Sequence, residues 1–176
     1  MIQLLRHLLA IAALPFMVAV VVPIWIARGS PGSAHVGRSA LEVLAQLGGL
    51  LALATGLVLF AASLRWFATV GKGTLAPWDP PRALVVRGPY RYVRNPMISG
   101  VIFILIGEAL VLLSRPHAMW ALAFAAINAV YIPLFEEPQL ERRFGASYRE
   151  YRRHVRRFLP RLRPWQPAAP PGRSAA

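Results

Sequence analysis

The stretch GPYRYVRNPMISG, residues 88–100, holds residues whose types and order could bind an anion. Asn95 is a good N-cap and Pro96 suits the first position of a helix, so we expect a helix to begin at this pair. The free N–H groups at that helix end would stand beside the guanidinium groups of Arg91 and Arg94, a combination typical of an anion site. The alternative is that the two arginines only anchor the segment to lipid phosphates.

A second stretch, residues 135–160, could supply the complementary charge. Glu136 and Glu137 are adjacent, and two carboxylates at a membrane boundary are costly unless solvent or cations neutralise them. The arginines that follow lie mostly off one apolar helical face, so the segment could also be a basic helix lying on anionic lipid. The residues of that face recur at spacings of three and four: Leu140, Phe144, Tyr148, Tyr151, Val155 and Phe158.

Together the two stretches predict a pocket with one cationic pole and one anionic pole. A ligand for such a pocket must itself carry both charges. S-Adenosylmethionine has a carboxylate, an ammonium group and a sulfonium group, and would therefore fit. A phospholipid head group also carries both charges, so the residues alone leave this choice open.

Four apolar segments are expected to position these residues. A membrane-spanning helix needs about 20 mostly apolar residues, and residues 8–27, 43–64, 97–113 and 118–135 meet or approach that length. The first segment could instead be a signal peptide, but its apolar run is long for one and no small-x-small cleavage site closes it. Small residues in the second segment would allow close helix packing, including a helix dimer. The sequence leaves the oligomeric state open.

Composition supports an integral membrane protein. The chain has 176 residues, of which 56% are hydrophobic, and its 20 Lys and Arg against 7 Asp and Glu give a net charge of +13. A soluble domain rarely carries so much apolar content, and a nucleic-acid-binding protein would explain the charge but not the apolar runs. The absence of Cys excludes disulfides, thiolate metal sites and Cys nucleophiles. The four His residues show no paired spacing, so we expect no metal and rank a haem protein low.

The distribution of Lys and Arg predicts the orientation. Seventeen of the 20 lie before the first span, in the loop 65–97 or after residue 135. The positive-inside rule then places both termini in the cytoplasm of a multi-pass inner (cell) membrane protein. The loop 65–97 is long but rich in aromatic and aliphatic residues, so we expect it to fold against the membrane face. Residues 1–163 are predicted to form a single domain, and residues 164–176 a disordered tail.

The predicted fold class is therefore an all-α integral membrane protein. It has about four transmembrane helices, a cytoplasmic loop and a C-terminal amphipathic helix. Glu108 and Asn128 lie inside the apolar segments. An intramembrane carboxylate is a candidate functional group, but Glu108 falls on the half of its span away from the expected site. We expect it to hydrogen-bond between helices.

The two stretches together resemble the isoprenylcysteine carboxyl methyltransferase and phospholipid methyltransferase superfamily of membrane enzymes. The resemblance covers residues 70–163. It rests on a G-x-Y motif, an Asn-Pro element where the family has R-H-P-x-Y-x-G, an apolar span, a hairpin, a tandem Glu and an F-G-x-x-Y-x-x-Y-x-x-x-V pattern. It implies S-adenosylmethionine as the methyl donor at the cytoplasmic face, with lipophilic acceptors entering from a bilayer that contains anionic lipid.

The resemblance also implies roles for individual residues. Arg94 and Glu137 are the expected catalytic residues, with Glu137 as the candidate base for an amine or thiol acceptor. Phe144 and Gly145 complete the tail motif. The implied cofactor-binding residues are Leu84, Val85, Tyr90, Asn95, Pro96, Met97, Gly100, Glu136, Tyr148 and Tyr151.

Three positions depart from the family pattern. Asn95 stands where many members have His, Ile98 where they have Tyr, and Ile132 where prenylcysteine enzymes have an Arg that holds the substrate carboxylate. These changes weaken the case for an isoprenylcysteine substrate more than the case for methyl transfer. A carboxylate acceptor is already ionised at pH 7, so positioning could supply most of its rate effect.

We therefore expect methyl transfer from S-adenosylmethionine to a lipophilic or membrane-associated acceptor. The reaction would be O-methylation of a carboxylate, or N- or S-methylation of a small or lipid acceptor. The alternative is a non-enzymatic membrane protein that binds anionic lipid through its basic C-terminal helix.

Overall fold

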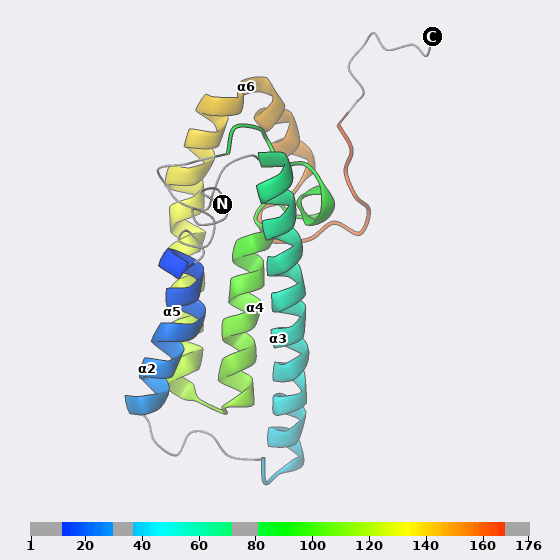
Figure 1. Ribbon diagram of the computed structural model, residues 1–176. Helices are drawn as coiled ribbons and strands as arrows, with labels where there is room; N and C mark the ends of the chain where they lie inside the picture. The colour runs from blue at the N-terminus through cyan, green and yellow to red at the C-terminus, as the bar shows by residue number, and fades with distance from the viewer. Residues whose placement is uncertain (1–11, 30–36, 72–80, 168–176) are drawn as a thin grey trace.

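A computed structural model of the chain describes residues 12–29, 37–71 and 81–167, and all regular secondary structure in these ranges is helical (Figure 1). The elements in chain order are η1 (Ala12–Val21), α2 (Val22–Gly29), α3 (Ala40–Trp66), η2 (Phe67–Gly71), η3 (Gly88–Arg91), α4 (Pro96–Val111), α5 (Arg115–Tyr131), η4 (Ile132–Glu136) and α6 (Glu137–His154).

Helices α2, α3, α4 and α5 run side by side (Figure 1). At one end of this bundle, α6 continues from α5 through η4 and bends over toward η3. We call the residues at this end, 81–95 and 137–167, the cap. The bundle therefore positions one helix start, that of α4, directly under the cap.

Length and composition support two of the four predicted spans. The continuous helices Ala40–Gly71 and Arg115–His154 are long and apolar enough to cross a membrane. Pro15–Gly29 and Pro96–Val111 are apolar but shorter. The predicted span 8–27 begins in residues outside the described ranges. The four-span arrangement is therefore carried forward as a proposal.

Helices α3 and α4 pack closely because glycines face each other. A Cβ at Gly56 would lie 2.7 Å from the carbonyl oxygen of Gly100, and one at Gly107 would lie 2.8 Å from that of Gly49. The two glycines of each helix are seven residues apart, which is two helical turns, so both fall on one face. The small residues Gly49 and Gly56 are thus used within the chain, not for the helix dimer that the sequence allowed.

We expect Gly56→Ala to lower the free energy of unfolding by about 1–3 kcal/mol, since backbone atoms cannot yield cheaply to the added methyl group. Gly48→Ala is the matched control, because no atom lies within 4 Å of the position of its Cβ. Ala is the better helix former, so that variant should be neutral or slightly stabilised. Unfolding in detergent, followed by circular dichroism, measures both. Equal stability of the two variants would contradict this packing.

The N-terminal helices are attached to α5 by two hydrogen bonds. Pro23 has no N–H, so the carbonyl of Val18, five residues earlier in a π-helical stretch, lacks that helical donor. The indole N–H of Trp120 donates to it at 3.1 Å. The buried ring of His117 bridges Ser114 Oγ (2.7 Å) and the carbonyl oxygen of Pro23 (3.1 Å).

The aromatic face of α6 packs inward. Tyr148, Tyr151 and Val155 form a buried cluster, against which Leu84 and Trp165 pack from other parts of the cap. This face is therefore not free to lie on lipid. The helix also ends at His154, four residues before the end of the predicted apolar face.

A break inside α6 lets the helix bend over the end of the bundle. Gly145 has φ 54° and ψ −125°. This left-handed backbone region is one that glycine adopts most readily. The Phe-Gly step of the tail motif is therefore a bend in the helix.

The segment after α6, residues 155–165, is hydrogen-bonded along the loop that precedes α4, and we call it the strap. The three bonds, each 2.9 Å, join Arg94 N to the carbonyl oxygen of Arg156, Arg161 N to that of Tyr92, and Trp165 N to that of Arg91. Trp165, which the sequence analysis assigned to the tail, thus bonds to the loop before α4. Residues 168–176 of that tail lie outside the described residues.

Candidate active site

The start of α4 lies where the sequence predicted it, but its N-cap does not have the expected form. Helix α4 begins at Pro96, and Asn95 makes no side-chain cap hydrogen bond. Instead the Asn95 carbonyl accepts from the backbone N–H and the hydroxyl of Ser99, both at 3.0 Å. The Asn95 side chain is thereby left for another partner.

Three buried hydrogen-bond donors belong to residues that are close together in the sequence just before α4. Arg91 Nη2, Arg94 Nε and Asn95 Nδ2 have no hydrogen-bond partner among the described residues. The Arg94 side chain is only 9% exposed. Buried polar groups in proteins are nearly always paired, and a helix N-terminus favours negative charge. The arrangement is therefore suited to a carboxylate or phosphate.

Glu137 is held by two arginines. Its Oε1 lies 3.0 Å from Arg94 Nη1, and Arg157 donates from Nε to Oε1 (2.6 Å) and from Nη2 to Oε2 (3.0 Å). Burial raises the pKa of Glu137, but the Arg157 hydrogen bond and the charges of Arg94 and Arg157 outweigh it and hold that pKa below its ordinary value. A carboxylate so engaged is a weak base. The sequence placed Arg94 and Glu137 at opposite poles, whereas the structure pairs them.

Glu136 is in the opposite situation. It makes no hydrogen bond or ion pair with any residue in the described part of the chain. Burial, and then the negative charge of Glu137, raise its pKa above the ordinary value. Burial and the charge of Glu136 also raise the pKa of Tyr90, so these two side chains lie near each other. Glu136 is therefore the carboxylate still free to meet a cation.

Aromatic side chains of α6 complete the site. The Tyr151 hydroxyl donates to the carbonyl oxygen of Tyr90 at 2.6 Å, and Arg94 Nη1 lies 3.5 Å from the Tyr148 hydroxyl. Burial, and then the charge of Glu137, raise the pKa of Tyr148 to about 12, so it is protonated at neutral pH. These contacts, together with the packing of Leu84 on the Tyr148 cluster, bring Leu84, Tyr90 and Arg94 against α6.

Other expected site residues have packing roles. Gly100 faces α3, where an added Cβ would lie 2.9 Å from Phe60 N. Val85 is buried and packs against Gly71, where an added Cβ would lie 3.2 Å from the Cγ2 of Val85. Pro96 is buried and Met97 is half-buried. None of these four makes a side-chain hydrogen bond among the described residues.

Two departures from the family pattern also have a structural context. Ile132 is fully buried at the start of η4, so apolar packing occupies the position where an Arg was expected. Ile98 is half-buried on α4. Among the described residues, no group of three or more His, Cys, Asp or Glu could hold a metal ion.

Sequence reasoning missed Arg157 and the strap. Arg157 belongs to a run of many arginines, and no spacing distinguishes it from its neighbours. Trp165 was assigned to the tail, yet its backbone carbonyl accepts from Arg91 Nε at 2.9 Å and its ring stacks on His154. A lone Trp in a Pro-rich tail was the available signal.

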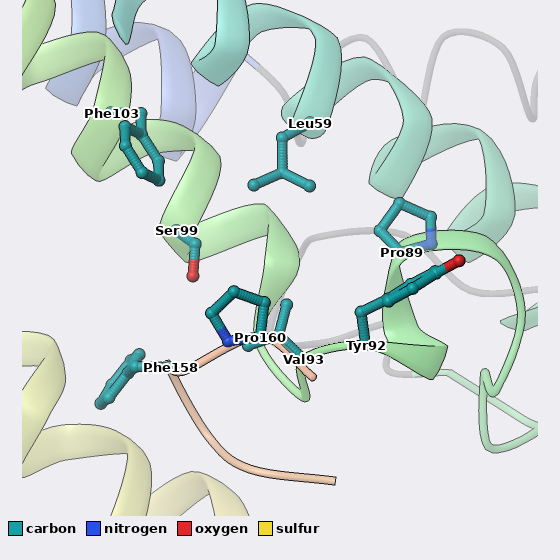
Figure 2. Close-up of a pocket in the computed structure, with 8 residues that line it drawn as sticks. All are labelled: Leu59, Pro89, Tyr92, Val93, Ser99, Phe103, Phe158 and Pro160. Carbon is teal, nitrogen blue, oxygen red and sulfur yellow. The ribbon is translucent and has the colours of Figure 1, made fainter. Parts of the chain in front are cut away.

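An apolar pocket of about 340 Å³ lies beside this site. It is enclosed by α3, α4, the loop before α4 and the strap (Figure 2). No charged side chain lines it. The lining residues are Leu59, Pro89, Tyr92, Val93, Ser99, Phe103, Phe158 and Pro160.

Over part of its length the chain is similar to known methyltransferases. The phospholipid methyltransferase family model matches residues 44–147, from α3 into α6. Methanethiol S-methyltransferase 2 of Bradyrhizobium diazoefficiens is 40% identical over 73 residues, which are 42% of this chain. The matched part spans only 27% of that relative's length. No solved structure matches the chain.

Proposed function

Because the chain belongs to the phospholipid methyltransferase family, we propose that it transfers a methyl group from S-adenosylmethionine to a lipophilic or membrane-associated acceptor. The observation that carries the proposal is that polar groups of opposite charge, without partners among the described residues, lie in the cap and at Glu136 beside it. Buried donors at the start of α4 and the unpaired carboxylate of Glu136 occur together.

The residues present fit S-adenosylmethionine. Arg91, Arg94 and Asn95 would hold its carboxylate at the start of α4, where helix N–H groups add their positive potential. Glu136 would face its cationic part. The donor supplies a methyl group made electrophilic by the sulfonium. Tyr148 and Tyr151, both buried, would exclude water and fix the orientation of the reacting groups.

A thiol is our first choice of acceptor. The relative from Bradyrhizobium acts, by its name, on methanethiol, and a buried Ile132 supplies no cation to hold a substrate carboxylate. A thiol must lose its proton before sulfur attacks the methyl carbon. Glu137 was the expected base, but its two arginines occupy it. Glu136, with its raised pKa, would take that proton.

The cap is proposed to lie on the cytoplasmic side of the inner membrane. The family and the apolar helices support a membrane protein, and the excess of Lys and Arg in the cap segments supports this orientation. Reporter fusions at residue 176 should report a cytoplasmic C-terminus. A reporter active only outside the cytoplasm would place the site on the other side.

A methyl-transfer assay with labelled S-adenosylmethionine tests the function. We expect transfer to alkyl thiols, with prenylated thiol acids and phosphatidylethanolamine as the other acceptors to compare. Labelling of only one of those would reassign the acceptor. No transfer and no cofactor binding by calorimetry would favour the non-enzymatic alternative, a protein that binds anionic lipid through its basic C-terminal region.

Charge reversal of Arg152, Arg153 and Arg156 should weaken the contact with anionic lipid and leave cofactor binding unchanged. All three are exposed, and the only ion pair that any of them makes with another described residue joins Arg152 to Glu141, at 3.2 Å. Each basic residue near an anionic surface contributes about 1 kcal/mol. We expect weaker enrichment of spin-labelled phosphatidylglycerol around the protein and an unchanged affinity for S-adenosylmethionine. Loss of that affinity in a folded protein would show that this face belongs to the site.

A further inference from the structure

The apolar pocket beside the site has no role in the proposed reaction. Its walls come from four parts of the chain, and Leu59, Ser99 and Phe103 contribute the part formed by α3 and α4 (Figure 2). The Ser99 hydroxyl is already bonded to the Asn95 carbonyl. The lining therefore offers a ligand apolar contact and no charge.

The loop before α4 separates this pocket from the carboxylates. Pro89, Tyr92 and Val93 line the pocket, whereas Tyr90 and Arg94 of the same loop contact α6. The strap is divided in the same way, with some residues lining the pocket and one contacting a carboxylate.

Phe158 and Pro160 of the strap line the pocket, while Arg157 reaches Glu137. A ligand in the pocket would thus touch the loop and the strap on the side away from Glu137. These two segments carry Arg94 and Arg157, the arginines that contact Glu137. It would not meet Glu136 directly.

Phe103 lines the pocket and is also partly exposed on α4, and residues next to Leu59 on α3 are exposed as well. On this pair Leu57 is 51% exposed, Val58 70% and Phe103 42%. Leu59 is the eighth residue from the end of α3, and Ser99 and Phe103 are the fourth and eighth residues of α4. If these helices span the membrane as proposed, the pocket opens to the bilayer just below its cytoplasmic surface.

We propose that this pocket binds one acyl chain of a bilayer lipid. Its volume is at the low end for small-molecule sites, enough for part of one chain and too small for a two-chain lipid. An apolar cavity gains contacts when an apolar chain fills it. Arg156 and Arg163 are exposed, and in the sequence they flank the pocket residues Phe158 and Pro160. Their charges favour a lipid with an anionic head group. The bound chain supports the loop and the strap from behind.

Lipid retention after purification tests the proposal, and Leu59→Trp is the informative variant because an indole would fill the pocket. Its control is Val58→Trp, the same kind of change on the adjacent, lipid-exposed position. Each protein is purified in detergent from membranes rich in phosphatidylglycerol, and the retained lipid is quantified by mass spectrometry. We expect retention to fall by about tenfold or more in Leu59→Trp and to stay at the wild-type level in Val58→Trp. Equal retention in both variants would overturn the proposal.

A second measurement does not depend on filling the pocket. The chain has no Cys, so Ser99→Cys and Leu122→Cys, the latter at an exposed position on α5, can each carry one bimane fluorophore. After removal of bulk lipid, retained lipid with brominated chains should quench only the label at residue 99. Equal quenching at both positions, or none at residue 99, would contradict the site.

The identity of the retained molecule separates this site from that of the methyl acceptor. Added S-adenosylmethionine should leave the retained lipid unmodified. Methylation of it would overturn the proposal, because the pocket would then hold the acceptor. The proposal depends on the membrane placement of α3 and α4 and not on methyl transfer, so absence of all transfer would not alter the retention result.

Discussion

Glu137→Gln is expected to destabilise the protein by about 3–5 kcal/mol, the cost of breaking a buried ion pair by removing one partner. The substitution keeps the size of the side chain but removes its charge. It would leave the guanidinium group of Arg94, whose side chain is 9% exposed, without the anion that it contacts at 3.0 Å. Arg157 would face one neutral amide oxygen in place of the carboxylate that accepts two of its hydrogen bonds, so the strap should loosen from α6.

Glu141→Gln is the matched control on the same helix. Glu141 also contacts two arginines, Arg149 at 3.8 Å and Arg152 at 3.2 Å, but its side chain is 32% exposed. Exposed ion pairs contribute about 0–1 kcal/mol, so this variant should unfold almost like the wild type. Chemical unfolding in detergent compares the two free energies of unfolding. Similar losses for both would mean that the pair with Arg94 does not stabilise the cap.

The effect of Glu137→Gln should depend on pH. The pKa of Glu137 lies below its ordinary value of about 4.5 in the folded state, so the ionised carboxylate contributes its stability above that value. The contribution is lost as the pH falls through the folded-state pKa. The difference in unfolding free energy between wild type and variant should therefore be largest near neutral pH and shrink below about pH 4.5. A difference that grew with acidity would contradict the assignment.

Glu136→Gln should weaken S-adenosylmethionine binding by about ten- to a hundredfold, since a hydrogen bond to a charged group contributes roughly 1.5–3 kcal/mol. Stability should change little, because Glu136 has no hydrogen-bond or ion-pair partner among the described residues. Removing a carboxylate next to Glu137 also relieves repulsion. Calorimetric titration in detergent measures the affinity. Arg94 is a poorer probe of the site, because changing it also removes one of the two arginines that contact Glu137.

The same titration with S-adenosylhomocysteine tells which cation Glu136 meets. This product lacks the sulfonium charge, so contact with that charge predicts a smaller loss for it than for S-adenosylmethionine. An equal loss for both would assign Glu136 to the ammonium group or ribose that they share. Glu108→Gln is the control, since Glu108 lies in the last turns of α4, far along the helix from its start at Pro96. If Glu136→Gln bound both ligands like the wild type, Glu136 would not belong to the site.

Local patterns in the sequence were enough to predict the start of α4 and an apolar face on α6, but not the strap. The start of α4 at Pro96 follows from the fixed φ of proline and its missing N–H, which act within one turn. The inward face of α6 follows from spacings of three and four, although the sequence did not say what it packs against. The Lys and Arg distribution and the two apolar helices of spanning length are likewise readable one segment at a time.

Tertiary structure decided that Glu137 is ion-paired and that Glu136 is not. The two residues are adjacent and chemically identical, so no local pattern separates them. They differ because Arg94, 43 positions before Glu137, and Arg157, 20 positions after it, both reach Glu137 and neither reaches Glu136. The glycines of α3 were decided in the same way, since only the packing of α4 shows which of them need to be glycine. A sequence shows which groups can form pairs, but the partners are chosen where distant segments meet, because charge pairing and close packing depend on distances in space.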